Sequence, residues 1–542
     1  MHIAIAQLNY HIGNFEANEQ KIIQSIQKAK AEKADLIVFA ELSICGYPPR
    51  DFLEFDDFLA ECEASIQRIA LHCDEIAAIV GAPSSNHDKG KNLYNSAYFL
   101  KDKGIHSIHH KQLLPTYDVF DENRYFEPGD ETQIIEYKNK KIAITICEDI
   151  WNLPKSNLYK KVPLDSLSTK TLDLHINIAA SPFSVQQESK REKVLKWNAT
   201  NYEVPVLYVN HVGAQTELVF DGNSCLYNSL GYPVLQLAAF EEDFQIFDET
   251  NLSKLKPLSK KIERYEKMEK ALILGISDYF KKLKFQKATL GLSGGIDSAL
   301  TLALAIKALG KESVIPILMP SQFSSNHSIE DSLKLCETLG CLNHLIEIES
   351  IYKAFIVQLE PLFNGTEFGI AEENIQSRVR GSLLMAHTNK FGTILLNTSN
   401  KSELAVGYGT LYGDMSGGLS VLGDVYKTEV FELSKWINRN EEIIPSNIIT
   451  KPPSAELRPD QKDTDSLPEY ETLDPLLKAY IEDRLSPKKL IEKGFDENLV
   501  KKIIRLVNIN EYKRYQAPPI LRVSEKAFGM GRRMPIVGKY LS

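Results

Sequence analysis

The sequence predicts an α/β protein made of two domains: an N-terminal α-β-β-α sandwich and a C-terminal doubly wound parallel sheet. Three observations lead to this fold class. A chain of 542 residues is too long for a single ordinary hydrophobic core. The first half is rich in short apolar strands, whereas the second half alternates between strands and helices. Such alternation is typical of a parallel sheet that is covered by helices on both faces.

Candidate strands recur along the first half, each a short apolar run bounded by polar or turn residues. They are MHIAIAQ (1–7), ADLIVFAE (34–41), AAIVGAP (77–83), NSAYFL (95–100), KIAITICED (141–149), LHINIAA (174–180) and PVLYVNHVG (205–213). Residues 18–33 carry apolar side chains at helical spacing and predict an amphipathic helix between the first two strands. We expect this first domain to span residues 1–245.

A polar stretch with a proline at residues 246–261 predicts a linker to a second domain at residues 262–542. An amphipathic helix at residues 262–283 opens that domain. Strands and helices then alternate as KATLGLS (287–293), a helix, VIPILMP (314–320), the helix SIEDSLKLCETLG (328–340), HLIEIE (344–349), a helix and GTILLNTS (392–399). Residues 456–470 are charged and interrupted by prolines, and we expect a mobile loop there, over the ligand site.

Net charge, composition and cysteine usage indicate which partners the protein does not bind and in which compartment it is found. The formal net charge of -9 disfavours nucleic acid as a partner, and no apolar run reaches the roughly 18 residues that a membrane span needs. The N-terminus begins directly as an alternating strand, without a signal-peptide pattern. The seven cysteines are scattered and form no CxxC pair, which suits free thiols in a reducing compartment. We therefore expect a cytoplasmic protein without nucleic-acid or membrane partners.

The stretch GLSGGIDSAL (291–300) predicts a phosphate site, because its glycines lie between a strand and the start of an apolar helix. Glycines let the backbone approach a ligand closely, and a helix N-terminus favours anions. Ser293 and Ser298 can donate to phosphate oxygens, and Asp297 indicates an intervening Mg²⁺ ion. No Gly-Lys-Ser/Thr follows, which favours a nucleotide that loses pyrophosphate. The alternative is a tight turn with no ligand.

A cysteine, a glutamate and a lysine each follow a predicted strand in the first half. Cys147 ends KIAITIC, Glu41 ends ADLIVFAE, and Lys111 follows the strand near IHSIHH. Three strand ends can converge at one edge of a sandwich. Glu41 would then take the proton from Cys147, Lys111 would stabilise an oxyanion, and the sulfur would carry an acyl group. The alternative is a packed core cysteine with two solvated surface charges.

The three contexts together resemble the nitrilase superfamily, whose Glu-Lys-Cys triad hydrolyses amides and nitriles, and the resemblance runs from residue 1 to about 245. Two further positions match side chains that hold glutamine in amidase members fused to synthetases: Tyr117, after LLPT, and Ser181, in AASPF. Those relatives commonly carry a glycine and a lysine shortly after SPF. Here Gln186 and Gln187 stand in their place, and Gln187 is expected to reach the substrate without a charge.

The SGGIDS loop resembles the pyrophosphate-releasing ATP-dependent ligases, and the stretches at 372–389, 397–418 and 425–433 resemble their NAD synthetase branch. Near the C-terminus, EYKRYQAPPI resembles that branch's basic segment. The resemblance implies that the ATP site is formed by Gly291, Leu292, Ser293, Gly294, Gly295, Ile296, Asp297, Ser298 and Thr398. It implies a deamido-NAD site of Asn374, Arg378, Glu403, Asp414, Lys427 and Lys513, with Mg²⁺ near Asp297 and Glu403.

Two of these assignments leave alternatives open at the level of the sequence. Asn374 is also suited to capping the helix that follows it, since Asn is a favoured N-cap residue. Arg378 and the neighbouring Arg380 are equally suited to helix-surface ion pairs, which contribute little.

Joined, the two halves resemble the family of glutamine-dependent NAD synthetases. The resemblance implies ATP-dependent amidation of deamido-NAD, with ammonia from L-glutamine, Mg²⁺ as cofactor and a homo-oligomeric assembly. A carbon–nitrogen hydrolase that binds a nucleotide only as a regulator is a second interpretation. The acidic and basic groups in TSNKSELAVGYGTLYGD (398–414) argue against it. A ligase acting on tRNA is disfavoured by the net charge and the lack of a basic stripe.

Overall fold

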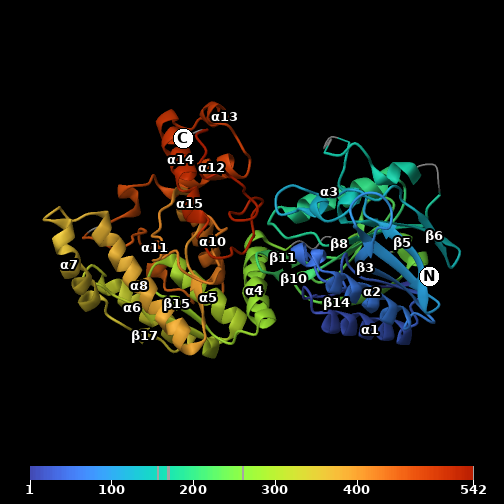
Figure 1. Cartoon of the computed structure of the whole chain (residues 1–542), viewed down its shortest axis with the longest axis horizontal. Helices are drawn as coiled ribbons and strands as arrows, with labels where there is room; N and C mark the ends of the chain where they lie inside the picture. The colour runs from blue at the N-terminus through green and yellow to red at the C-terminus, as the bar shows by residue number, and fades with distance from the viewer. Residues whose placement is uncertain (155–157, 168–170, 255, 259–261, 460, 541–542) are drawn as a thin grey trace. The chain divides into compact units, whose positions relative to one another are not determined.

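The computed structural model describes residues 1–154, 158–167, 171–254, 256–258, 262–459 and 461–540. The chain divides into two compact units, Met1–Ile262 (unit 1) and Glu263–Ser542 (unit 2), which Figure 1 shows in blue to green and in green to red. Among the described residues, no helix combines the length and the apolar character that crossing a bilayer requires.

Unit 1 is built on two six-stranded sheets. The first has the order β14-β1-β2-β3-β4-β5, with β1 (His2–Gln7), β2 (Leu36–Val38), β3 (Ala77–Ser85), β4 (Leu93–Lys101), β5 (Gly104–His110) and β14 (Asp243–Asp248). The second has the order β13-β12-β9-β8-β7-β6, with β6 (Ile134–Tyr137), β7 (Lys140–Ile146), β8 (Leu174–Ala179), β9 (Val206–Asn210), β12 (Cys225–Tyr227) and β13 (Pro233–Gln236). A separate hairpin joins β10 (Val212–Gln215) to β11 (Leu218–Asp221).

Period-two alternation in the strands places one face of each sheet against the other sheet and the opposite face against helices. Ile3 and Ile5 of β1 belong to the core cluster that includes Ile144 of β7, whereas Ala4 belongs to the cluster that includes Ile22 of α1. The helices are α1 (Phe15–Ala31), α2 (Asp56–Ala70) and α3 (Gln187–Asn201), with short 3₁₀ turns η1 (Arg50–Glu54), η2 (Glu122–Arg124), η3 (Cys147–Ile150), η4 (Pro163–Leu167) and η5 (Glu249–Lys254). Unit 1 is therefore the expected α-β-β-α sandwich.

Unit 2 contains a five-stranded sheet in the order β17-β16-β15-β18-β19, with every pair parallel. Its strands are β15 (Ala288–Gly291), β16 (Val314–Leu318), β17 (His344–Leu345), β18 (Ile394–Asn397) and β19 (Leu419–Ser420). Strand β15, the first strand of unit 2, lies at the centre, and the later strands are added outward on both sides of it. This confirms the doubly wound sheet, and its topological switch point lies between β15 and β18, where ligands bind in such folds.

Helices cover this sheet and extend beyond it. Helices α5 and α8 both pack against β15, α5 together with α4 and α10, and α8 together with α7. The helices are α4 (Arg264–Leu283), α5 (Ile296–Leu309), α6 (Asn326–Leu339), α7 (Glu349–Phe363), α8 (Ile370–Phe391), α9 (Lys401–Val406), α10 (Lys427–Ile437), α11 (Ser446–Thr450), α12 (Tyr470–Ile481), α13 (Pro487–Glu492), α14 (Glu497–Ile509) and α15 (Glu511–Arg514), with 3₁₀ turns η6 (Lys311–Ser313) and η7 (Asp463–Asp465). A second core cluster joins α9, α12, α13 and α14.

Three local expectations meet the structure differently. Residues 246–248 of the expected linker belong to β14, which pairs along its whole length with β1; residues 255 and 259–261 of that linker lie outside the described residues. The expected strand at 344–349 is reduced to His344–Leu345, because this edge strand pairs with only two residues of β16. Residues 456–459 and 461–469 form a loop with one 3₁₀ turn, and Tyr470 begins α12; residue 460 lies outside the described residues. The mobility of this loop stays a prediction.

Candidate active sites in the two units

The structure brings Glu41 and Lys111 into direct contact inside unit 1. Glu41 follows β2 and Lys111 follows β5, and both side chains are fully buried. The Lys111 ammonium lies 2.7 Å from Oε1 of Glu41, whose Oε2 accepts a hydrogen bond from the Ala180 backbone at 2.8 Å. Burial disfavours the ammonium, but Glu122 and Glu41 outweigh burial and raise the pKa of Lys111 well above its usual value. Lys111 is therefore a fixed positive charge at neutral pH.

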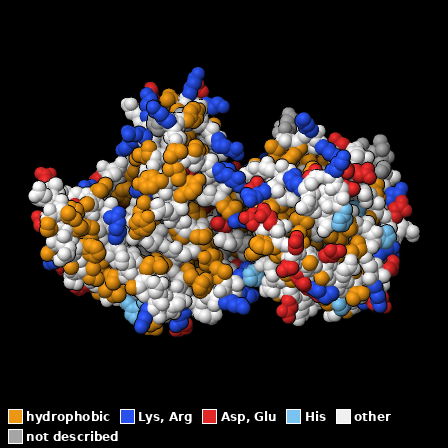
Figure 2. All heavy atoms as spheres, in the orientation of Figure 1, with side chains coloured by type: hydrophobic (Ala, Val, Ile, Leu, Met, Phe, Trp, Pro, Cys, Tyr) orange, Lys and Arg blue, Asp and Glu red, His pale blue; other side chains and the backbone are white. Residues whose placement is uncertain are grey.

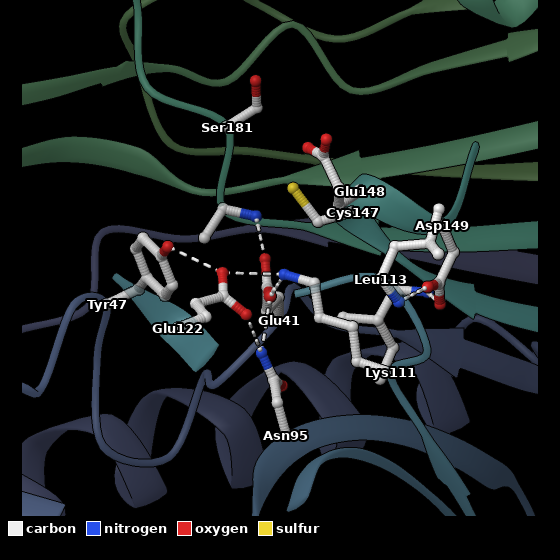
Figure 3. Close-up of polar contacts among 12 residues, drawn as sticks. Glu41, Tyr47, Asn95, Lys111, Leu113, Glu122, Cys147, Glu148, Asp149 and Ser181 are labelled. Carbon is white, nitrogen blue, oxygen red and sulfur yellow. Dashed lines mark hydrogen bonds and ion pairs between the residues drawn. The ribbon is translucent and has the colours of Figure 1, made fainter. Parts of the chain in front are cut away.

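Glu122, which the sequence reasoning missed, is the second carboxylate on Lys111. Its Oε1 lies 2.8 Å from the ammonium and also accepts a hydrogen bond from Tyr47 Oη at 2.8 Å. Asn95 Nδ2 donates to Glu41 at 2.7 Å and to Glu122 at 3.3 Å (Figure 3). Burial raises the pKa of Glu122. The lysine, two glutamates and one amide form a closed network, so each member fixes the others.

Cys147 is the first residue of η3, directly after β7, and its backbone φ of 42° lies in the left-handed region. A non-glycine residue in that region is strained, which is common where a side chain must be presented to a ligand. Figure 3 shows its sulfur beside the Glu41 and Lys111 side chains. Burial raises the pKa of Cys147 well above the usual range, Glu41 adds to that effect and Lys111 opposes it. The resting group is a thiol, and forming a thiolate requires a base.

Tyr117 lies beside Glu148, the neighbour of Cys147 in the chain. Tyr117 Oη is 2.9 Å from both carboxylate oxygens of Glu148, and Tyr159 Oη donates to the same carboxylate at 3.1 Å. Burial raises the pKa of Glu148 to about 7, although Lys111 and the two hydroxyls oppose it. Tyr117 remains 40% exposed. The sequence reasoning did not single out Glu148, although it adjoins the proposed nucleophile.

Ser181 and Gln187 also meet in unit 1. Gln187, the first residue of α3, donates from Nε2 to Ser181 Oγ at 3.2 Å. The backbone of Ser181 is held by Asn210, whose Oδ1 accepts its N–H at 2.9 Å. Two of the three residues expected to hold glutamine thus touch each other, and the third contacts the residue next to Cys147.

In unit 2, the SGGIDS loop joins β15 to α5 at the switch point of the sheet. Gly294 has a φ of 80°, and a Cβ atom on it would lie 2.4 Å from the backbone oxygen of Ser328, so only glycine fits. Ser293 Oγ accepts the Gly295 N–H at 3.2 Å and lies 3.2 Å from Ser298 Oγ. Gly295 is the N-cap of α5 without a side-chain cap. The loop therefore leaves the α5 N-terminus available to an anion.

A cavity of about 300 Å³ lies over this loop. Of the residues expected at the two substrates, those lining it are Gly291, Leu292, Ser293, Gly295, Ile296, Asp297, Ser298, Thr398, Glu403, Asp414 and Lys427. Gly294, Asn374, Arg378 and Lys513 do not line it. Lys451 and Asp463, which the sequence did not single out, also line it, as does Arg380, for which the sequence suggested a helix-surface ion pair. Burial lowers the pKa of Arg380 to about 10, so it stays a cation at the cavity wall.

Asp297 and Glu403 share one cation, Lys427, at the N-terminus of α10. The Lys427 ammonium lies 2.5 Å from Oδ2 of Asp297 and 3.4 Å from Oε1 of Glu403. Burial raises the pKa of Glu403 to about 8. The Lys427 ammonium opposes this rise, and the Asp297 carboxylate adds to it. Among the described residues, no group of three or more Asp, Glu, His or Cys side chains stands ready to hold a metal. Two carboxylates fit a Mg²⁺ ion that takes its other ligands from phosphates and water.

Asn374 does not cap a helix, so that alternative was wrong. Helix α8 begins at Ile370 with Gly369 as its N-cap, which places Asn374 inside the first turns, where it accepts a hydrogen bond from Thr410 at 2.8 Å. Arg378 and Arg380 donate to the backbone oxygens of Leu411 and Met319, at 3.2 and 3.0 Å.

Asp414 and Lys513 are also engaged with backbone. Asp414 accepts the Thr410 N–H at 2.6 Å. The Lys513 ammonium lies 2.8 Å and 2.9 Å from the carbonyl oxygens of Gly407 and Gly409, and burial lowers its pKa. Both residues therefore help to shape the segment 407–414 beside the cavity.

Comparisons with known proteins agree with this division. The carbon-nitrogen hydrolase family model matches residues 2–253, and the NAD synthase model matches residues 268–517. A glutamine-dependent NAD(+) synthetase of Synechocystis sp. is 46% identical, over 98% of both chains. One of Thermotoga maritima is 40% identical, over 100% of this chain and 99% of the relative. The structure of glutamine-dependent NAD+ synthetase from Acinetobacter baumannii in complex with adenosine diphosphate has 39% identity and a TM-score of 0.78, over 99% of both chains.

The two expected resemblances are confirmed over the whole length of the sequence, and the chain belongs to the family of glutamine-dependent NAD(+) synthetases.

Proposed function

We propose that the chain amidates deamido-NAD to NAD with ATP and takes the nitrogen from L-glutamine. The observation that carries the proposal is the full-length match to relatives of that name, 46% identical over 98% of the chain. Geometry supports each half separately. Unit 1 has a buried lysine–glutamate network beside a strained cysteine, and unit 2 has a glycine loop under a cavity at the switch point of a parallel sheet.

In unit 1, Glu41 takes the proton of the Cys147 thiol as the sulfur attacks the amide carbon of glutamine. The Lys111 ammonium stabilises the oxyanion of the tetrahedral intermediate. As the intermediate collapses, Glu41 passes the proton to the leaving nitrogen, so that ammonia departs and a glutamyl thioester remains on Cys147. Water then hydrolyses the thioester to glutamate and restores the thiol. The raised pKa of Cys147 explains why a base must lie at hand. Tyr117, Ser181 and Gln187 hold the amino-acid end of glutamine in this proposal.

In unit 2, the nicotinate carboxylate of deamido-NAD attacks the α-phosphate of ATP, and pyrophosphate leaves. Residues 291–298 and Thr398 hold the ATP, with the N–H groups at the start of α5 toward its phosphates. Asp297 and Glu403 would hold Mg²⁺, which neutralises phosphate charge when bound. Lys427 supplies a further positive charge. Ammonia then attacks the carbonyl carbon of the acyl-adenylate and displaces AMP. The product is NAD.

Asn374, Arg378, Asp414 and Lys513 are proposed to border deamido-NAD together with Glu403 and Lys427. Because Lys513 and Arg378 donate to the backbone of residues 407–411, they support the wall of the site as well as contributing charge. The proposal assigns glutamine hydrolysis to the part at 1–245 and synthesis to the part at 262–542. Of the predicted linker at 246–261, residues 246–254 continue unit 1 through β14 and η5.

We also propose a homo-oligomer that forms through unit 2. Helix α7 buries only Tyr352, and Figure 2 shows apolar side chains over the part of the surface where α7 and α8 lie. Exposed apolar side chains on one face of α7 and around the start of α8 are Phe355, Leu362, Phe368 and Ile370. These four residues are called the α7 patch below. Exposed apolar patches often mark interfaces, and we propose a second copy of the chain as the occupant because the family resemblance implies a homo-oligomer. Free thiols at all seven cysteines suit a cytoplasmic location.

The test is to incubate the protein with ATP, Mg²⁺, deamido-NAD and glutamine labelled with ¹⁵N in the side-chain amide. The expected products are NAD with ¹⁵N in its carboxamide, AMP, pyrophosphate and glutamate. A hydrolase with a regulatory nucleotide would instead give glutamate without NAD or AMP.

The Cys147→Ala variant tests whether unit 1 releases ammonia from glutamine and unit 2 carries out the synthesis. It should lose synthesis with glutamine and keep synthesis with added ammonium, because only unit 2 is then needed. Failure of ammonium to rescue the variant would refute the division of labour.

A further inference from the structure

Asp149 is a buried carboxylate beside Cys147 that the proposed chemistry does not use. It lies two residues after the cysteine in η3 and is 2% exposed. A carboxylate that is taken out of water needs compensating donors. Three backbone N–H groups supply them here.

These donors come from two separate segments of the chain. Oδ1 of Asp149 accepts from the N–H of Gln112 at 2.9 Å and of Leu113 at 2.8 Å. Oδ2 accepts from the N–H of Ile146 at 2.9 Å. Figure 3 shows the carboxylate against Leu113, on the segment that continues from Lys111. One side chain thus connects the residues just after Lys111 to the residue just before Cys147.

This placement matters because the backbones of Cys147 and Lys111, which Asp149 connects, are each constrained by other parts of the structure as well. Cys147 has a φ of 42°, a strained conformation that must be maintained by its surroundings. The backbone of Lys111 is held by Asn95, whose carbonyl oxygen accepts its N–H at 2.8 Å. The hydrogen bonds of the Asp149 carboxylate fix the distance between turn η3, which carries Cys147, and the segment after β5, which carries Lys111.

The protonation state fits that task. Burial raises the pKa of Asp149 to about 6, and the backbone hydrogen bonds from Ile146 and Leu113 oppose the rise. An ionised carboxylate accepts at both oxygens, as the three N–H donors require. An amide of the same shape accepts at one oxygen only and turns its own N–H groups toward a donor.

We propose that Asp149 is a positioning residue of the thiol site, whose carboxylate sets where the Lys111 ammonium lies relative to the Cys147 sulfur. This inference rests on the proposed function of unit 1. It adds a residue to that site which does not touch the substrate and acts through the backbone of its neighbours.

The test compares Asp149→Asn with Asp173→Asn. Asp173 is a matched control, because its carboxylate accepts the Lys141 N–H at 2.8 Å, at the end of β7 that lies away from Cys147. For D149N we expect glutamine-dependent kcat to fall roughly tenfold or more, with a much smaller change in the KM for glutamine, since a misplacement of about 1 Å can cost on the order of 100-fold. Ammonium-dependent synthesis should stay within about twofold of wild type, because it needs only unit 2. A glutamine-dependent kcat equal to that of D173N would overturn the proposal.

A second readout does not depend on turnover. The rate of Cys147 alkylation by iodoacetamide is followed against pH, with the modified cysteine identified by peptide mass spectrometry. Lys111 lowers the pKa of Cys147, so its displacement in D149N should move the alkylation midpoint to higher pH, whereas D173N should match wild type. An unchanged midpoint in D149N would also overturn the proposal, even if wild-type protein proved inactive with glutamine.

Asp149→Glu covers the case in which D149N does not fold. It keeps the charge and moves the carboxylate by one methylene. We expect folded protein with lowered glutamine-dependent kcat and nearly unchanged KM. Wild-type kcat in D149E would show that the position of this carboxylate does not matter, and would overturn the proposal.

Discussion

The ammonium of Lys111 lies as close to Glu122, at 2.8 Å, as it does to Glu41, at 2.7 Å. Only one of these glutamates can serve as the base for Cys147 while the other keeps the lysine in place. Glu41 is also fixed by the N–H of Ala180, whereas Glu122 is fixed by Tyr47. Because Glu41 is the proposed base for Cys147, we predict that Glu122 is the residue that anchors Lys111.

Replacing Glu122 with Gln should lower the glutamine-dependent kcat by roughly 10- to 1000-fold, because the Lys111 ammonium loses one of its two buried carboxylates. Ammonium-dependent synthesis should be unchanged. Steady-state assays with both nitrogen sources make the measurement. Glu127→Gln is the control, since Glu127 is partly exposed and accepts the Lys91 N–H in the same region. Equal effects of the two substitutions would contradict the anchoring role.

Replacing Glu41 with Gln should lower glutamine-dependent turnover but make the Cys147 thiol more reactive toward alkylation. Removal of the base should lower glutamine-dependent turnover by roughly 100-fold or more. Glu41 raises the pKa of Cys147, so the thiolate should form at lower pH in the variant. Alkylation by iodoacetamide, measured against pH, should therefore show a lower midpoint. The thiolate fraction at neutral pH should rise about tenfold if the Cys147 pKa falls by about one. A midpoint above that of wild type would contradict the electrostatic account.

Much of this arrangement could be predicted from the sequence, because strand ends mark it. Cys147, Glu41 and Lys111 each follow an apolar strand, and the SGGIDS turn was recognisable for the same reason. Because β2 and β5 belong to one sheet and β7 to the other, the ends of these three strands meet only through the packing of the two sheets. Short strands such as β12 (Cys225–Tyr227) were missed, since three residues carry no measurable periodicity.

The remaining contacts depend on tertiary structure. Glu122 lies in a 3₁₀ turn with no periodic pattern, and it meets Tyr47 and Asn95 only after three distant segments have folded together. The alternative in which Asn374 caps α8 was wrong, although Asn is a favoured N-cap residue. In the structure Gly369 takes that position, and Glu372 accepts its N–H at 2.7 Å.

Replacing Gln187 with Lys should lower the KM for glutamine by roughly three- to tenfold, because a cation beside Ser181 attracts the substrate carboxylate. The kcat should change little, since Gln187 touches Ser181 and not the triad. Gln24→Lys, on the exposed face of α1, repeats the charge change elsewhere in unit 1. If the KM for glutamine in Q187K equals that in Q24K, Gln187 does not face the carboxylate.

Replacing Leu362 with Asp should weaken self-association, because it places a charge beside Phe355 on the same face of α7, within the α7 patch. Leu362 is 78% exposed, so the change should leave the fold of the subunit intact. Sedimentation velocity over a range of concentrations would show the shift to smaller species. Leu71→Asp, at an exposed apolar position of unit 1, is the control. Identical sedimentation of L362D and wild type would place the interface elsewhere.

Lys427 occupies the position between Asp297 and Glu403 where a metal ion is proposed to bind. Its ammonium lies 2.5 Å and 3.4 Å from the two carboxylates, and its side chain is 4% exposed. A unit charge at these distances offsets much of the attraction that the carboxylates would exert on another cation. Lys427 therefore competes with a divalent ion whenever no phosphate is present to draw the ammonium away.

Replacing Lys427 with Met removes the competing charge and keeps most of the side-chain length. We expect the variant to bind Mn²⁺ roughly tenfold or more tightly than wild type in the absence of nucleotide, because the two carboxylates are then uncompensated. The electron paramagnetic resonance signal of free Mn²⁺ measures this binding without any turnover. Lys451→Met is the matched control, since Lys451 lines the same cavity and hydrogen-bonds Ser328 instead of these carboxylates. Tighter Mn²⁺ binding by K451M alone, or by neither variant, would show that the Lys427 ammonium does not compete with a divalent ion for this position.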